Sequence, residues 1–239
     1  MPTIDRGRDA TPKLIWRFTL YGMQEKLREL RLRLGLLKLQ DLDAHEDRVP
    51  DSALAKAAFE LAAGLSSPLL LNHAVRTYHF GAILAVRSGL RVDRELLYVA
   101  AVLHDLGLTP RYEAEPGSFE WVGARLARDF GLEHGMDAPR ADLLHDAIAL
   151  HSSVGIAGSR EPEVAMVHHG AGLDLFGSRL AEIPPLELER LLEEWPRCDF
   201  KTAFPTCLAR QAQQEPDSHI AGAIGLGLAD RILAAPFAE

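Results

Sequence analysis

Apolar residues recur at intervals of three and four along most of the chain, which is the period of an amphipathic helix. Segments rich in glycine and proline, such as GLTPRYEAEPGS and GLEHGMDAP, separate these runs. The only alternating stretch, LRLRL, has helical flanks. We therefore predict an all-α chain, with helices over 13–40, 51–63, 69–88, 93–106, 119–130, 139–151, 162–176, 185–195 and 217–234.

The run DRELLYVAAVLHDLG, residues 93–107, is the most uniformly apolar of these helices. Asp93 can cap its start, and Gly107 lies where helices often end. With almost no polar face the helix should be buried, yet it finishes with His104 and Asp105. A carboxylate out of water costs several kcal/mol unless it is paired. We expect either a positive partner or a metal ion beside Asp105.

The N-terminal segment is basic, whereas the rest of the chain is acidic. Residues 1–40 hold nine Lys or Arg and four Asp or Glu, a net charge of +5; the remainder holds 17 and 30, a net charge of −13, and the total is −8. One apolar stripe in this segment, at four-three spacing, comprises Met23, Leu27, Leu30, Leu34 and Leu37. Such a helix binds a membrane surface or a partner in some proteins. We favour packing on its own domain or on a second copy, giving a homo-oligomer, since two heptads are too few for a coiled coil.

Composition indicates a globular protein with a sizeable core: 47% of residues are hydrophobic, and the mean hydropathy is −0.04. No apolar run reaches the roughly 18 residues of a membrane span, and the N-terminus lacks signal-peptide architecture. We expect a cytoplasmic protein, with Cys198 and Cys207 as ordinary thiols. The net charge of −8 argues against nucleic acid as a partner.

Four residues on three predicted buried helices could meet at one point. His73 lies near the start of one helix, His104 and Asp105 end another, and Asp174 lies in a third, where Gly170 and Gly172 allow close helix packing. Two imidazoles and two carboxylates suit zinc, iron or manganese. The alternative from spacing alone is a set of unconnected structural polar groups.

These residues resemble the signature of the HD superfamily of metal-dependent hydrolases: a His, then His-Asp, then a distant Asp. The segments NHAVRTYHFG, AAVLHDLGLT, SFEWVGARLARDF, HDAIALHSSVGIA, EPEVAMVHHGAGLDLFG and WPRCDFKTAF are similar, in this order, to blocks of its cyanamide hydratase-like branch. The resemblance covers about residues 65 to 230. It implies a single HD-type helical domain over 51–239, with residues 1–50 as an N-terminal basic helical extension. It also implies that His73, His104, Asp105 and Asp174 bind a divalent metal, with zinc ahead of iron or manganese.

Two departures from the family pattern affect the number of metals and the substrate that the resemblance implies. Two-metal members place a histidine directly before a Glu-x-x-Gly-Ala element, where this chain has Phe119. Phenylalanine cannot coordinate a metal, so we expect one metal per chain. In the hydratase branch this block carries a Val-Asp pair, which Trp121 and Val122 replace here.

Further residues receive roles by the same resemblance. His151 lies where two-metal enzymes have another ligand, and we expect it to act in catalysis or to contact substrate. Glu120 is either a general base or a residue that orients Arg125 or a ligand. Arg76 is either a buried partner of an acidic residue or a substrate contact. We expect His145, His168 and His169 to be packing residues or to lie behind the site.

The metal-facing helices should line a small, mostly apolar substrate pocket. Its predicted walls are Phe80, Ile83, Phe119, Trp121, Ile148 and Leu150. The resemblance implies that water activated by the metal adds to a small neutral nitrile-type molecule, converting cyanamide to urea. One alternative is a phosphohydrolase acting on nucleotides or phosphomonoesters, which should show more basic residues near the ligands. Another is a non-catalytic binding domain, although such relatives usually lose metal ligands.

Overall fold

A computed structural model describes residues 11–42 and 47–239. These residues form α-helices and short 3₁₀ turns, with no strand among them, which confirms the all-α prediction. The helices are α1 (Thr11–Arg33), α2 (Ala53–Leu65), α3 (Pro68–Arg87), α4 (Arg94–Leu103), α5 (Phe119–Glu133), α6 (Ala138–Ala149), α7 (Pro162–Phe176), α8 (Pro185–Glu194), α9 (Phe200–Gln214), α10 (His219–Gly225) and α11 (Leu228–Leu233). None of the described helices is both long and apolar enough to cross a membrane.

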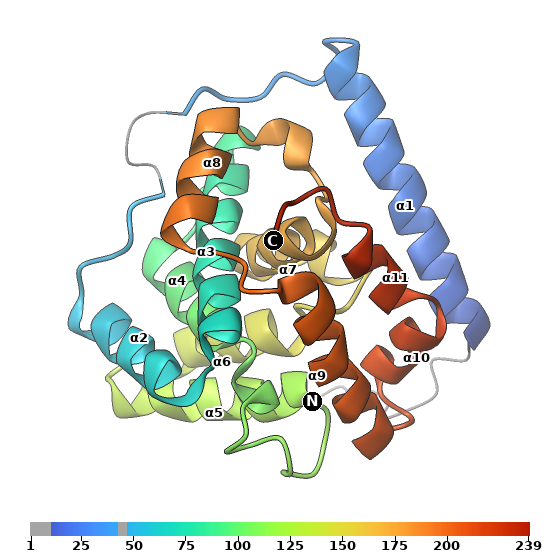
Figure 1. The fold of residues 1–239 in the computed structure, drawn as a ribbon. Coiled ribbons are helices and arrows are strands. Elements are labelled where there is room, and N and C mark those ends of the chain that lie inside the picture. Colours follow the sequence, from blue (N-terminus) through green and yellow to red (C-terminus); the bar gives the residue numbers. More distant parts are fainter. Residues whose placement is uncertain (1–10, 43–46) are drawn as a thin grey trace.

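Helices α3 and α7 form the centre of the molecule, with α4 packed against both (Figure 1). Their backbones touch because two glycines leave room. A Cβ on Gly170 would lie 2.2 Å from the Thr77 carbonyl oxygen, and one on Gly81 would lie 2.7 Å from that of Met166. Gly170 thus has the packing role that its position predicts. Gly172 does not, since a Cβ there would meet only the Tyr21 hydroxyl, at 3.8 Å.

The apolar helix α4 is buried as predicted, and the Asp93 side chain caps it by accepting a hydrogen bond from the Leu96 amide at 3.0 Å. It ends at Leu103, before the predicted residue 106, and a 3₁₀ turn, Leu106–Leu108, follows. Gly107 has a different role from the expected helix stop. A Cβ there would lie 2.3 Å from the Phe119 carbonyl oxygen, so the glycine lets the start of α5 approach the site.

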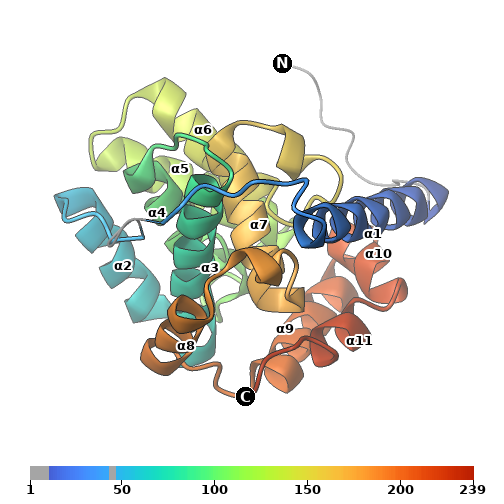
Figure 2. The ribbon, with the colours of Figure 1, turned by 90° about the horizontal axis from the view of Figure 1, so that it is seen from above.

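Helix α1 lies along one side of the molecule, next to α10 (Figures 1 and 2). Of the two kinds of packing predicted for its apolar stripe, the structure contradicts packing on the same domain. The stripe that includes Met23 and Leu30 is exposed, each by 52%, whereas Leu14 is buried and Phe18 stacks on His219. The helix packs through its aromatic side because those side chains fit the surface of α7 and α10. Packing of the outer stripe on a second copy stays a prediction.

The C-terminal region contains two errors of prediction. Helix α9 lies where a connection was expected, and Pro205 is inside it. A proline there removes one helical hydrogen bond, but burial of Phe200, Phe204 and Leu208 on one face outweighs that loss. The predicted helix 217–234 is two helices, α10 and α11, divided at Gly227, whose φ is +84°.

Candidate metal site

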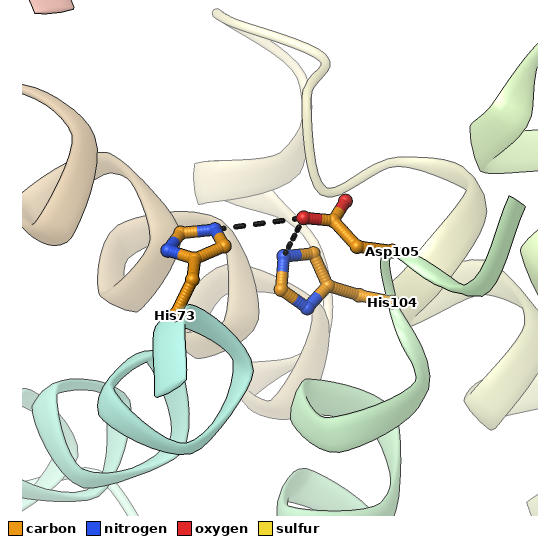
Figure 3. A group of neighbouring side chains, drawn as sticks. All are labelled: His73, His104 and Asp105. Atoms are coloured by element: carbon orange, nitrogen blue, oxygen red, sulfur yellow. Dashed lines mark ion pairs between the residues drawn. The ribbon is translucent and has the colours of Figure 1, made fainter. Parts of the chain in front are cut away.

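Three buried side chains converge where α3 passes the end of α4 (Figure 3). His73 comes from α3, and His104 and Asp105 come from the turn that follows α4. Asp105 Oδ2 lies 3.7 Å from His73 Nε2 and 3.4 Å from His104 Nε2. One potential ligand atom from each residue lies within 4.8 Å of the others, so the three could hold one metal ion.

The hydrogen bonds of the two imidazoles determine which nitrogen faces Asp105. His73 Nδ1 lies 2.7 Å from Asp174 Oδ2, and His104 Nδ1 donates to the Ala101 carbonyl at 2.7 Å. Since these partners are acceptors, each Nδ1 carries a proton, and Nε2 is the ring nitrogen left to face Asp105. Both imidazoles therefore present metal-binding nitrogens to the Asp105 side chain.

His151 lies on the other side of the same carboxylate. Its Nδ1 donates to the Ile148 carbonyl at 2.6 Å, and its Nε2 is 3.8 Å from Asp105 Oδ1. Its ring centroid lies 4.8 Å from that of His104. The structure thus brings His151 beside the three convergent residues, facing the oxygen of Asp105 that His73 and His104 do not face.

Both oxygens of the Asp105 carboxylate are buried, and neither has a hydrogen-bond partner among the residues that the structure describes. Burial raises its pKa. Burial, and then the neighbouring His73, lower the pKa of His104 to about 3, and burial followed by His104 lowers that of His151 to about 4. His104 and His151 are therefore neutral at pH 7, and neither offsets the carboxylate as an imidazolium. A buried carboxylate facing their nitrogen lone pairs is repulsive unless a cation lies between them, so these residues fit a divalent metal.

Asp174, in contrast to Asp105, accepts hydrogen bonds from positively charged side chains. Arg76 donates to both of its oxygens, at 2.7 and 2.8 Å, and Arg197 donates to Oδ1 at 3.0 Å. Burial alone would raise the pKa of Asp174, but Arg76 and the hydrogen bond with His73 hold it far below its usual range. The sequence places Asp174 among the ligands, whereas in the structure it contacts the nitrogen of His73 that faces away from Asp105.

Arg76 is completely enclosed. Besides Asp174, it donates to the carbonyl oxygens of Trp195 and Pro196, at 2.8 and 3.1 Å. Of the two roles considered from the sequence, the structure gives it that of a buried partner, but of Asp174 rather than of Asp105 or Glu120. It does not line the pocket described next, so we do not propose it as a substrate contact.

Sequence reasoning did not identify Arg197, which lies in the turn between α8 and α9. Cys198 and Asp199 follow it with φ values of +57° and +59°. This unusual turn directs the guanidinium onto Asp174, where it is buried. The arginine within the apolar block WPRCDF was the available signal, since an arginine among buried residues requires an acidic partner.

A cavity of about 70 Å³ adjoins the convergent residues. Its polar wall includes His73, His104, Asp105, His151 and His168. Its apolar wall comes mostly from α1, α7, α9, α10 and α11: Phe18, Tyr21, Leu175, Phe176, Phe204, Leu208, Ile220, Ala223 and Leu228. The cavity is therefore small and mostly apolar, as predicted.

The residues predicted to line it are mostly elsewhere. Phe119 does line the cavity, with its ring 5.6 Å from that of His151. Trp121 is 42% exposed and packs on His145 outside it, while Phe80 and Ile148 are in the main core. Of these residues Phe119 was placed correctly; α1, α9, α10 and α11, which the sequence did not connect with the site, form much of the wall.

Glu120 is buried next to the cavity without lining it. Its Oε1 accepts a hydrogen bond from Ser152 Oγ at 2.6 Å, and its Oε2 has no partner. It does not orient Arg125, which pairs with the exposed Glu115 instead. Glu120 therefore holds the residue after His151 in place, and its role as a general base stays a prediction.

The fold and the convergent residues agree with a comparison of the sequence with known families. The profile of the HD domain matches residues 70–195, more than half of the chain, and the chain belongs to this family. It is a metal-dependent enzyme of the HD superfamily.

Among curated relatives, the chain is similar to cyanamide hydratases DDI2 and DDI3 of Saccharomyces cerevisiae. Identity to each is 26% over 175 residues, covering 71% of this chain and 77% of the relative. A shorter stretch of 85 residues is 36% identical to ribonuclease Y of Acidothermus cellulolyticus, covering 36% of this chain and 15% of that protein. The predicted similarity to the cyanamide hydratase-like branch is confirmed.

Proposed function

We propose that His73, His104 and Asp105 bind one divalent metal, with zinc favoured over iron or manganese. Two imidazole nitrogens and one carboxylate oxygen are a donor set typical of catalytic zinc, which keeps a position open for water or substrate. Asp174 then acts by fixing the ring and tautomer of His73. Phe119, beside His151, has no atom to bind a second ion, which supports a single metal.

We further propose that the enzyme adds water across the C≡N bond of a small neutral nitrile, with cyanamide as the substrate and urea as the product. The water oxygen bonds to the nitrile carbon, and both water hydrogens end on the former nitrile nitrogen. A bound metal supplies the Lewis acidity that activates water for this addition. His151 lines the cavity with an Nε2 lone pair, so it can accept a hydrogen bond from that water and hold it in place.

The observation that carries this proposal is the unpaired Asp105 carboxylate, surrounded by imidazole lone pairs at the base of a small apolar cavity. A cavity of about 70 Å³ suits a molecule of few atoms. Among the described residues, its lining includes no Lys or Arg, and Arg76 and Arg197 are both bound to Asp174. Several phosphate charges would have no partner there, which disfavours the phosphohydrolase alternative.

The test combines metal analysis with two assays on the purified protein. We expect close to one metal per chain, urea formation from cyanamide, and loss of both after Asp105→Asn. Arg125→Gln, which alters an exposed ion pair, is the matched control and should keep both. Phosphate release from nucleotides with no urea from cyanamide would establish the alternative. A protein without metal and with neither activity would be a binding domain.

A further inference from the structure

His168 has a buried acceptor atom without a donor. It lies on α7, and its Nδ1 donates to the backbone carbonyl of His151 at 2.7 Å. Its Nε2 is buried and has no hydrogen-bond partner within residues 11–42 and 47–239. Burial lowers the pKa of His168, so the ring is neutral and Nε2 carries a lone pair.

Neighbouring side chains do not supply the missing donor. The Tyr21 ring meets His168 edge-on, with 5.8 Å between centroids, and its hydroxyl bonds to Ser178. His219 Nε2 donates to the Ser152 carbonyl at 3.1 Å. Since His168 lines the cavity, a molecule inside the cavity is the remaining source of a donor.

We propose that His168 Nε2 accepts a hydrogen bond from an N–H group of the substrate, so that the site selects small nitriles with an amino group on the nitrile carbon. This inference rests on the proposed function and deepens it, because it assigns a subsite for the part of the substrate that does not react. A site built around a hydrogen bond rejects analogues that lack the bonding group, since its own polar atom is then left unpaired.

The bond between His168 and His151 explains how this subsite can position the substrate. His168 is fixed to the backbone of the residue that we expect to hold the water. The His151 ring is itself held by the bond from its Nδ1 to the Ile148 carbonyl, so hydrogen bonds to the backbone restrain both rings relative to each other. In cyanamide the amino group is bonded directly to the nitrile carbon. One small molecule thus offers the N–H donor for His168 and the carbon to which the water oxygen adds.

Two substitutions separate this role from simple packing. In His168→Asn, the amide nitrogen can replace Nδ1 and keep the bond to the His151 carbonyl, but the acceptor at Nε2 is lost. In His168→Gln, the amide oxygen can replace Nε2. We expect Asn to lower kcat/KM for cyanamide by about tenfold to a hundredfold, mainly through KM. Gln should restore most of it, and metal content should be unchanged in both variants.

The decisive comparison uses N,N-dimethylcyanamide, which has the same C≡N group but no N–H. The wild type should prefer cyanamide, and His168→Asn should lose most of that preference, since the dimethyl compound never makes the hydrogen bond. An equal loss on both substrates, or no loss on either, would overturn the proposal.

A binding measurement makes the result independent of turnover. In zinc-loaded protein with ¹⁵N-labelled histidine, urea should move the His168 Nε2 resonance upfield, whereas tetramethylurea should not. This shift without urea production from cyanamide would reject the proposed function but keep the subsite. Urea production without the shift, and with unaltered kinetics in His168→Asn, would reject the subsite but keep the function.

Discussion

Asp105 and Asp174 are two buried aspartates in opposite electrostatic surroundings. Asp174 has two arginines and a histidine as partners, whereas both oxygens of Asp105 are without a donor. Removing a carboxylate from a buried ion pair leaves its partners as unpaired buried charges, whereas removing an unpaired buried carboxylate relieves the cost of burying it. The two residues should therefore respond differently to the same substitution.

Asp105→Asn should abolish metal binding but leave the metal-free protein as stable as the wild type, or more stable, because it removes an unpaired buried charge. Asp174→Asn should destabilise the metal-free protein by about 3–5 kcal/mol, since Arg76 and Arg197 lose their counter-charge. It should weaken metal binding by only about 10–100-fold. Thermal unfolding of metal-free protein and titration with zinc measure both effects. Abolished binding in both variants, with undiminished stability in Asp174→Asn, would instead make Asp174 the ligand that the sequence predicts.

At the scale of elements, the contact between α3 and α7 holds His73 on the first helix in reach of Asp174 on the second. This contact depends on Gly170, because any Cβ would overlap the Thr77 carbonyl. The spacing of these two backbones therefore sets the geometry of the site as well as the stability of the core.

Gly170→Ala should destabilise the protein by about 1–3 kcal/mol or more, because the added methyl forces the two helices apart. Gly172→Ala is its matched control on the same helix, two residues away. Its Cβ would meet only the Tyr21 hydroxyl at an ordinary distance, so stability should be unchanged or slightly higher. Thermal unfolding of the two variants tests this difference, and equal melting temperatures would show that the helices can separate without cost.

An ion pair between Arg28 and Glu182 connects helix α1 to the rest of the molecule. This buried carboxylate accepts hydrogen bonds from Arg28 of α1, at 2.6 and 2.9 Å, and from Arg179. Burial raises its pKa, but the bonds from Arg179 and Arg28 outweigh burial and lower it to about 2. A lowered pKa means that the stabilisation is complete above the ordinary value of 4.5 and is lost as the pH falls toward 2.

Glu182→Gln should therefore lower the melting temperature at pH 6 by a few degrees, and the difference from wild type should shrink between pH 4.5 and 2. Amide hydrogen exchange in α1 should accelerate at pH 6. Glu29→Gln, which alters an exposed ion pair within α1, should change neither property. A difference in melting temperature that stays constant across this pH range would contradict the assignment.

At the scale of the whole molecule, the spacing of apolar residues predicted the features that depend on residues close together in the sequence. The capped, apolar helix α4 and the order of the central helices followed from periodicity and from Asp93. The sequence singled out His104 and Asp105 because they end an apolar run, His73 because it lies near a helix start, and His151 through the family resemblance.

Long-range packing determined what the sequence did not predict. Helix α9 contains Pro205, and only its burial against the site makes it a helix. Arg197 reaches Asp174 across 23 residues, and spacing alone did not decide whether the stripe of α1 packs on its own domain, where the structure leaves it exposed. The division of the chain at residue 50 stays a prediction, although Phe18 and Tyr21 from the first part line the cavity.

The position of α1 also has a consequence for how quickly the metal can be exchanged. His73 and His104 are each only 1% exposed, and Asp105 is 5% exposed, while α1 contributes Phe18 and Tyr21 to the wall above them. A chelator reaches an ion there only after this wall moves. The rate of metal removal should therefore be limited by the rate at which α1 opens. As the chelator concentration rises, this removal rate should reach a plateau. Glu182→Gln should raise that plateau rate without changing the equilibrium affinity for zinc. Removal that instead accelerates in proportion to chelator concentration, equally in both proteins, would mean that the ion is open to solvent by another route.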